Sequence, residues 1–308
     1  MPLHPLPLLR LLLSSLWLTA NTLLWCWPLF ALALLRLLPL PATAQRLLRQ
    51  LMGGIATAWI AGNSAWLHGL CRGRWRVRGL EQLSGLGSCL VVSNHQSWVD
   101  ILVLQGVLNR RLPMLRFFLK RELIWLPVIG LCCWALDFPF MRRRSKAWLA
   151  RHPERHGEDL ATTRRACQRL QGVPVAIFNF AEGTRFSAPK HAAQPSPYQH
   201  LLRPRAGGLA LAIDAMGEQL QALVDITLFY PDGQPRFIDL LSGRLRRVWV
   251  EIEVRPIPAE FLGRSYTEDE AYRLQFQHWL NALWAAKDLR LTALHAQRDE
   301  DREAVTRA

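Results

Sequence analysis

The stretch CLVVSNHQSWVD, residues 89–100, joins a short apolar run to a histidine and a carboxylate. The run Cys89–Ser93 is typical of a buried strand, and helical periodicity begins after Trp98. His95 and Asp100 are five residues apart, about 140° around an ideal helix, so they share no helical face. They meet only if His95 lies in the turn before the helix and Asp100 in the first turns of the helix. This arrangement predicts a histidine that a carboxylate orients and that acts as a base.

Structural roles fit the same residue types, and the spacing alone leaves them open. Asn94 suits a helix cap, His95 a buried hydrogen bond, and Asp100 the positive end of a helix dipole. Catalysis is therefore one of two interpretations of this stretch until other parts of the chain are considered.

A second polar turn, Glu182-Gly183-Thr184-Arg185, follows the apolar run 173–180. Glycine permits a tight turn, in which backbone N–H groups and the arginine side chain converge on an anion. The planar fork of the guanidinium group suits a phosphate monoester. The same four residues also form ordinary turns, so the turn taken alone has two interpretations.

The amino-acid composition limits the classes of partner that the protein can bind. The chain has 308 residues, half of them apolar, and a formal net charge of +14. This balance fits either nucleic acid or the anionic surface of a membrane. The sequence has no helix-turn-helix, aromatic RNA-binding or zinc pattern, and its cysteines show no CxxC spacing. We therefore expect a membrane partner, no nucleic acid and no metal site.

The N-terminal part of the chain carries most of the apolar residues. The run from Leu11 to Leu35 has no charge, and roughly 20 apolar residues suffice to cross a bilayer. A second uncharged run, 52–70, is interrupted by glycine and polar residues. The two runs predict one membrane span with an interfacial helix, or a shallow hairpin that re-emerges on the same side. Arginines after Leu70 place the following segment in the cytosol, and a cleaved export signal is the alternative interpretation.

Strands and helices alternate along the rest of the chain. This alternation predicts an α/β fold, a sheet with helices on its faces. Polar residues predict a loop at 186–200, and charge predicts disorder from Arg298 onward. Further strands are predicted at 75–80, 114–119, 223–230 and 248–254, and helices at 98–108, 159–170, 207–216 and 270–283.

The motifs NHQSWVD and AEGTR, in this order, resemble motifs I and III of the glycerolipid acyltransferases, the family of 1-acylglycerol-3-phosphate acyltransferase. The segment 120–130, KRELIWLPVIG, is similar to a K-x-E-L-x-x-x-P-x-x-G segment of that family. Residues 137–142 lie where the family has an acceptor-binding motif that ends in a basic residue. The run 132–165 is similar to bacterial inner-membrane members of the family.

The resemblance implies a mixed β-sheet flanked by helices, the glycerolipid acyltransferase fold, after an N-terminal membrane-embedded helical segment. The expected units are a membrane helix or hairpin at 1–72, a catalytic domain at 73–262, and a C-terminal helix with a charged tail at 263–308. Two features depart from the family pattern. Asp225 interrupts a strand where the family has a proline, and Arg203-Pro-Arg205 replaces a lysine before a glycine-rich helix.

The resemblance also implies an activity, in which a fatty acyl group passes from acyl-CoA or acyl carrier protein to a lysophospholipid hydroxyl. The expected acceptor is lysophosphatidic acid, and the expected location is the cytoplasmic side of a bacterial inner membrane. His95 is the expected general base, Asp100 orients it, and no cofactor is required because the thioester donor is already activated. Glu182 is expected to position Arg185 or to bind the glycerol. The family pattern assigns the acceptor site to these residues: Glu182, Gly183, Thr184, Arg185, Arg142 and Arg205.

Two alternatives to this activity remain. The first is an acyltransferase for another lysophospholipid, such as monolysocardiolipin. The second is a basic, membrane-anchored interaction protein without enzymatic activity, which the net charge of +14 also fits.

Overall fold

The computed structural model describes residues 5–70, 74–141, 151, 158–168, 170–266 and 268–307. Arg142, one of the predicted acceptor-site residues, lies outside the described residues. Six strands form the main sheet, in the order β1-β8-β7-β2-β6-β3. Neighbouring strands are parallel except for β7 and β8, so the predicted mixed sheet is confirmed. The bounds are Arg74–Arg78 (β1), Cys89–Ser93 (β2), Leu115–Phe117 (β3), Ala176–Phe180 (β6), Ala222–Phe229 (β7) and Arg247–Arg255 (β8).

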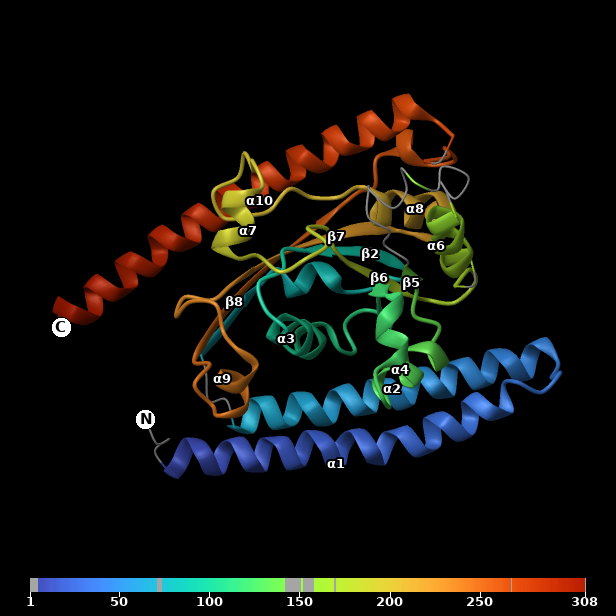
Figure 1. The fold of residues 1–308 in the computed structure, drawn as a ribbon, viewed down its shortest axis with the longest axis horizontal. Coiled ribbons are helices and arrows are strands. Elements are labelled where there is room, and N and C mark those ends of the chain that lie inside the picture. The colour runs from blue at the N-terminus through green and yellow to red at the C-terminus, as the bar shows by residue number, and fades with distance from the viewer. Residues whose placement is uncertain are drawn as a thin grey trace.

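Helices flank this sheet on both faces (Figure 1). Their bounds are Pro5–Leu35 (α1), Ala42–Leu70 (α2), Val99–Leu108 (α3), Ile129–Ala135 (α4), Glu158–Gln168 (α6), Ala188–Ala193 (α7), Gly207–Met216 (α8), Phe237–Leu241 (α9) and Glu270–Arg307 (α10). Short 3-10 helices occupy Leu80–Leu83 (η1), Arg121–Trp125 (η2), Gly217–Gln219 (η4) and Ala259–Phe261 (η5). A separate two-stranded sheet pairs Leu119–Lys120 (β4) with Phe140–Met141 (β5).

The main sheet separates two apolar cores. Helices α6, α8 and α10 cover one face, and α3 with the α1–α2 pair covers the other (Figure 1). Strands β2 and β7 are buried along their whole length. Because helices cover both faces, these central strands are mainly apolar on both faces rather than alternating, with Asp225 and Thr227 as buried polar exceptions in β7.

Helices α1 and α2 form an antiparallel hairpin. The Asn21 side-chain amide donates a hydrogen bond to Oδ1 of Asn63, 2.8 Å away, inside the hairpin. Nearer the open end, Trp66 Nε1 donates to the Ser14 hydroxyl over 3.1 Å. Among the described helices, α1 alone is long and apolar enough to cross a bilayer. The two predicted apolar runs therefore pack against each other as one helical unit.

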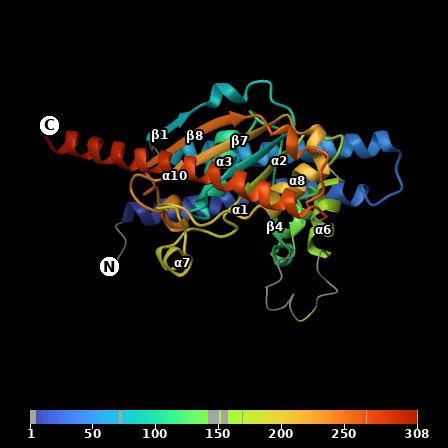
Figure 2. The same ribbon diagram turned by 90° about the horizontal axis from the view of Figure 1, so that it is seen from above.

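The C-terminal helix extends further than predicted. The charged residues from Arg298, for which the sequence predicts disorder, continue α10 to Arg307. The first half of α10 is anchored because Tyr272, Phe276 and Trp284 are buried in the core. Extending an existing helix needs no new nucleation step, so the charged end remains helical although it projects beyond the sheet (Figure 2).

The segment 186–200 also differs from the predicted loop. It contains the short helix α7, which has a proline, Pro189, in its first turn. Proline favours the start of a helix because its fixed φ is helical and its missing N–H would have no partner there.

Candidate active site

Directly after strand β2, the side chain of Asn94 continues the hydrogen-bonding pattern of the sheet. Asn94 Nδ2 donates to the carbonyl oxygen of Leu228, and Asn94 Oδ1 accepts the N–H of the same residue, both over 2.9 Å. The amide thus extends the pairing between β2 and β7 by one position. The interpretation of Asn94 as a helix cap is wrong, because helix α3 begins at Val99 without a side-chain cap. Asn94 instead fixes where the following turn begins.

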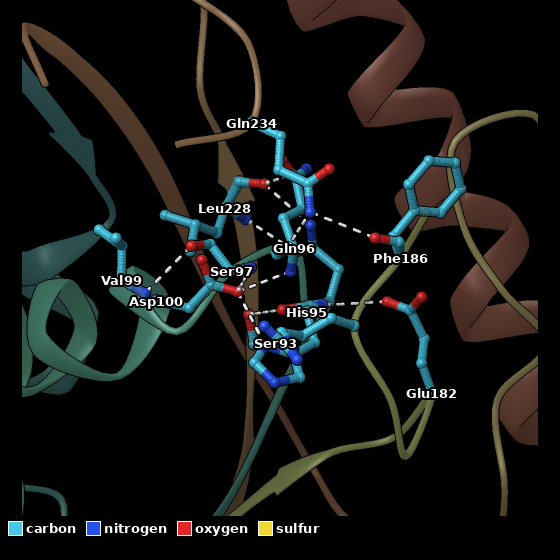
Figure 3. Close-up of polar contacts among 12 residues, drawn as sticks. Ser93, His95, Gln96, Ser97, Val99, Asp100, Glu182, Phe186, Leu228 and Gln234 are labelled. Carbon is cyan, nitrogen blue, oxygen red and sulfur yellow. Dashed lines mark hydrogen bonds and ion pairs between the residues drawn. The ribbon is translucent and has the colours of Figure 1, made fainter. Parts of the chain in front are cut away.

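His95 and Asp100 meet as the spacing predicts (Figure 3). Nδ1 of His95 lies 2.8 Å from Oδ2 of Asp100. His95 lies in the turn after β2, and Asp100 lies in the first turn of α3. The Asp100 carboxylate is fully buried, whereas 13% of the His95 side chain is exposed. The imidazole therefore has one edge on a buried carboxylate and retains access to solvent.

The Asp100 carboxylate is surrounded by hydrogen-bond donors. Oδ2 accepts the backbone N–H groups of Gln96 (2.6 Å) and Ser97 (2.9 Å), and Oδ1 accepts the Tyr230 hydroxyl (2.8 Å). An ionised carboxylate only accepts hydrogen bonds, so Nδ1 of His95 carries the proton in this contact. The lone pair of the neutral imidazole then lies on Nε2, which is the atom that can accept a proton.

The backbone N–H and carbonyl of His95 both form hydrogen bonds with the segment that contains the Glu182–Arg185 loop. The His95 N–H donates to Oε1 of Glu182 over 3.0 Å, and the His95 carbonyl accepts the Phe186 N–H over 2.7 Å. The imidazole also stacks on the Phe180 ring, with centroids 3.9 Å apart and planes 14° from parallel. Glu182 and Phe186 lie on the other side of the histidine turn from Asp100 (Figure 3), and Phe180 covers one face of the imidazole.

Glu182 connects two backbone segments of the site. Both of its oxygens accept backbone N–H groups, from His95 and from Leu202, each over 3.0 Å. Its side chain is buried, and burial raises the pKa of the carboxyl to about 8. The hydrogen bonds of Glu182 go to these two backbone N–H groups rather than to Arg185, and its binding of the glycerol stays a prediction. Glu182 links the histidine turn to the loop before α8.

The rest of the turn presents cations to solvent. Gly183 has φ = 70°, the left-handed conformation that glycine favours, and its N–H donates to the Phe180 carbonyl over 2.9 Å. That N–H is therefore engaged within the turn rather than turned toward an anion. The Thr184 hydroxyl accepts a hydrogen bond from Lys190 Nζ over 2.7 Å. Arg185 is exposed, with its guanidinium carbon 4.9 Å from the centre of the Trp98 ring.

Arg205 meets this loop through its backbone. Its N–H donates to the Ala181 carbonyl over 2.8 Å, and its side chain is exposed. Among the described site residues, the structure thus joins the His95 turn and the Glu182 loop, with Arg185, Lys190 and Arg205 at the solvent side.

An apolar cavity of about 240 Å³ lies beside the site. Helices α1, α2 and α3 and the segment 114–138 line it, with side chains that include Trp25, Ile55, Phe117 and Leu126. Trp98 lines the same cavity and lies under Arg185. Because Trp98 is three residues from His95, the cavity adjoins the histidine turn.

A buried ion pair lies beneath the site. Lys287 of α10 is fully buried and contacts Asp225 of β7, and its Nζ donates to the Ile226 carbonyl over 2.6 Å. Arg290 contacts the other oxygen of Asp225. Burial raises the pKa of Asp225, yet Lys287 and Arg290 together hold it below its ordinary value. The aspartate that departs from the family pattern is therefore an attachment point for α10.

Four residues that hold or flank the site carry no sequence motif. Tyr230 and Phe180 sit at the ends of apolar strands, Lys190 lies in a polar segment, and Lys287 lies on a helix with many charges. The only sequence signal for any of them is Asp225, which pairs with Lys287. Burying a carboxylate inside an apolar strand without a cationic partner costs free energy, so Asp225 indicates that such a partner exists. The missed residues are Phe180, Lys190, Tyr230 and Lys287.

The fold and site define a class of protein, an α/β protein with a histidine–aspartate pair at the end of a central strand beside an apolar cavity. The acyltransferase family model matches residues 74–230, half of the chain, which includes both motifs. The chain belongs to the acyltransferase family.

Similar proteins from other organisms are named as 1-acyl-sn-glycerol-3-phosphate acyltransferases. The human 1-acyl-sn-glycerol-3-phosphate acyltransferase delta is 28% identical over 218 residues, which cover 66% of this chain and 52% of the relative. The Arabidopsis thaliana 1-acyl-sn-glycerol-3-phosphate acyltransferase 3 is 32% identical over 179 residues, which cover 53% of this chain and 44% of the relative. The chain spans about half the length of the curated relatives it matches. The crystal structure of the LPA acyltransferase PlsC from Thermotoga maritima aligns with a TM-score of 0.48 and 15% identity, over 91% of this chain and 98% of that one.

Proposed function

We propose that this protein is a membrane-bound acyltransferase that moves a fatty acyl group from acyl-CoA or acyl carrier protein to a lysophospholipid hydroxyl. The acceptor that we favour is lysophosphatidic acid, which yields phosphatidic acid. The observation that carries the proposal is the 2.8 Å contact between His95 Nδ1 and Asp100 Oδ2, within a chain of the acyltransferase family. The relatives named as 1-acyl-sn-glycerol-3-phosphate acyltransferases support this choice of acceptor.

The proposed reaction uses His95 as a general base. Nε2 takes the proton of the acceptor hydroxyl while the hydroxyl oxygen attacks the thioester carbonyl carbon. The carbon–sulfur bond then breaks, and the imidazolium returns the proton to the departing thiolate. Asp100 stabilises the imidazolium, and general-base catalysis of this type accelerates reactions about 10²–10⁴-fold. The thioester supplies the activation, so the proposal includes no bound cofactor.

The proposed acceptor phosphate binds at the solvent side of the Glu182–Arg185 loop. Arg185 is exposed beside the Trp98 ring, and Lys190 lies against Thr184 at the same loop. Two cations suit a phosphate monoester, and the guanidinium fork adds a defined geometry.

The apolar cavity supports an acyl-chain substrate. Its walls are almost entirely hydrocarbon and aromatic side chains, and Trp98 connects it to the histidine turn. Burying a methylene group there stabilises a bound chain by about 0.8 kcal/mol. We propose that the acyl chain of the donor occupies this cavity with its carbonyl near His95.

We propose that the α1–α2 hairpin anchors the domain at the cytoplasmic side of a bacterial inner membrane. Large apolar side chains of α1 are exposed, among them Leu16 (67%) and Trp27 (77%). The turn of the hairpin is flanked by Arg36 and Arg46, which argues against a hairpin that crosses the whole bilayer. A hairpin that lies flat at the surface of one leaflet keeps these arginines at the interface and brings the site to a lipid acceptor.

The test is an acyl-transfer assay with purified full-length protein in detergent. Lysophosphatidic acid, monolysocardiolipin and a monoacylglycerol are offered with acyl-CoA or acyl carrier protein as the donor, and products are identified by mass spectrometry. We expect phosphatidic acid to form and His95→Ala to abolish it without changing membrane association. Arg185→Ala is expected to raise KM for lysophosphatidic acid, but not for the monoacylglycerol, which lacks a phosphate.

Each alternative has its own outcome in this assay. If only monolysocardiolipin gives a product, the protein is an acyltransferase whose acceptor is monolysocardiolipin rather than lysophosphatidic acid. Transfer that persists in His95→Ala would refute the assignment of the base. No transfer to any acceptor would favour the interaction protein.

A further inference from the structure

The segment 123–136, which we call the apolar tip, exposes an unusual amount of apolar surface. It contains the end of η2, the turn at Pro127 and helix α4. The segment has no charged residue, whereas Glu122 and Asp137 flank it. Its exposed large apolar side chains lie within ten residues of one another: Trp125 (84%), Leu126, Ile129, Leu131 and Trp134.

Tight backbone packing holds the apolar tip in one shape. The Ile129 N–H donates to the Pro127 carbonyl over 2.7 Å, which closes a three-residue turn around Val128. Val128 has φ = 65°, a strained conformation for a β-branched residue. Gly130 permits the close approach of η2 to α4, because an added Cβ would collide with the Ile124 carbonyl. Such strain persists only where the surrounding structure maintains it, so the exposed side chains have a rigid support.

The apolar tip adjoins the exposed apolar surface of α1. Helix α4 packs on the α1–α2 hairpin (Figure 1), and Sγ of Cys132 lies 3.4 Å from Sγ of Cys26 on α1. The residues next to these cysteines in the chain, Leu131 and Trp27, are both exposed. Exposed apolar side chains therefore continue from α1 onto α4 across this contact.

The chemistry of the apolar tip suits a lipid bilayer better than a protein partner. Specific protein interfaces contain roughly one hydrogen bond per 100–200 Å². The side chains of the apolar tip offer only two indole N–H groups and two thiols for such bonds. Tryptophan is enriched where the hydrocarbon of a bilayer meets its headgroups, since the ring is apolar and the N–H is polar.

We propose that the apolar tip is a second membrane-docking element, which inserts Trp125 and Leu131 into the hydrocarbon edge of the leaflet on which the α1–α2 hairpin lies. The inference rests on the proposed membrane anchoring by that hairpin. Two contacts with the same leaflet fix the orientation of the domain, whereas the hairpin alone permits rotation about its long axis. Leu126 and Ile129 also line the apolar cavity, so docking places the rim of this cavity in hydrocarbon rather than in water.

The test is photo-cross-linking of the full-length protein in vesicles made only of phosphatidylcholine. The photoreactive amino acid p-benzoylphenylalanine, which inserts into nearby C–H bonds, is placed at one position at a time, and adducts are identified by mass spectrometry. Trp125 and Leu131 report on the apolar tip, and Leu16 reports on α1. The control is Leu289, which is 72% exposed on α10, across the sheet from the hairpin (Figure 1). We expect lipid adducts at the first three positions and none at Leu289.

A charge on the apolar tip provides a second measurement. Trp125→Glu changes an exposed side chain, so we expect the unfolding temperature to stay that of the parent. Because a carboxylate is costly in hydrocarbon, the variant is expected to lower the yield of lipid adduct at Leu131 several-fold and to leave the yield at Leu16 unchanged. Leu289→Glu is the matched control and is expected to leave both yields unchanged.

The outcomes separate this proposal from the proposed function. Lipid adducts at Leu16 without any at Trp125 and Leu131 overturn the docking of the apolar tip and leave the anchoring by α1 intact. Absence of lipid adducts at all three positions overturns both. Adducts at Trp125 to a second copy of the chain instead of lipid, or equal effects of Trp125→Glu and Leu289→Glu, also overturn the proposal. Cross-linking requires no turnover, so the result does not depend on whether the protein transfers acyl groups.

Discussion

The hydroxyl of Tyr230 donates a hydrogen bond to Oδ1 of Asp100, 2.8 Å away, although 130 residues separate them in the chain. Tyr230 is buried at the end of β7, and Asp100 is buried at the start of α3. The contact occupies the carboxylate oxygen that His95 does not use. The proposed catalytic pair is thus a network of three side chains, in which the third comes from another strand.

Tyr230→Phe tests this network. The change leaves Oδ1 of Asp100 buried without a donor, so the carboxylate is held less firmly against His95. We expect kcat to fall roughly tenfold with little change in KM, and the free energy of unfolding to fall by about 1–3 kcal/mol. Steady-state kinetics and thermal unfolding measure the two effects. A variant that loses stability but keeps its kcat would show that Tyr230 is purely structural.

Glu182 predicts a pH dependence of stability. Its pKa rises from 4.5 to about 8 on folding. Between these values the folded protein holds a proton that the unfolded chain has lost, so stability is full below about 4.5 and falls as the pH rises to about 8. The loss amounts to roughly 5 kcal/mol at most, at 1.36 kcal/mol per pH unit over the interval from 4.5 to about 8.

Glu182→Gln isolates this effect, because glutamine does not titrate. As the pH rises, we expect the unfolding free energy of the parent protein to fall relative to that of the Glu182→Gln variant. Denaturant titrations at pH 5 and pH 8 measure the difference. Parallel curves for the two proteins would show that Glu182 is ionised in both states.

The buried pair of Lys287 and Asp225 predicts strong coupling between α10 and the sheet. Lys287→Met leaves Asp225 without its buried cation and is expected to destabilise the protein by roughly 3–5 kcal/mol. Adding Asp225→Leu removes the stranded charge, so the double variant is expected to be more stable than Lys287→Met alone. Thermal unfolding of the four proteins gives the coupling energy. Additive effects would contradict the pairing.

Two glycines of α2 make a matched test of the hairpin. An added Cβ at Gly62 would lie 2.6 Å from Oδ1 of Asn21, whereas nothing lies within 4 Å of one at Gly54. Gly62→Ala is therefore expected to destabilise the protein by roughly 1–3 kcal/mol through overpacking. Gly54→Ala is expected to stabilise it by up to about 1 kcal/mol through helix propensity. Equal effects of the two changes on the unfolding temperature would show that α1 does not pack on α2 at Gly62.

Local patterns predicted most of the elements and part of the site. The apolar run before Asn94 and the periodicity after Trp98 place a turn between a strand and a helix, and the contact of His95 with Asp100 follows from that turn. Where the predictions are wrong, a neighbouring element supplies the reason. The end of α10 is helical because its first half is anchored in the core, and Asn94 pairs with Leu228 of a strand that lies far away in the sequence.

The sequence by itself determined the alternation of strands and helices, the histidine–aspartate pair and the two N-terminal apolar runs, because each depends on residues close to one another in the chain. Only the tertiary structure decided what surrounds the pair. Tyr230, Glu182 and Lys287 reach the site from separate elements, and the strand order β7-β2-β6 is what brings the first two beside His95. Contacts between distant segments depend on how the strands are ordered and which faces the helices cover, and neither leaves a periodic signal in the chain.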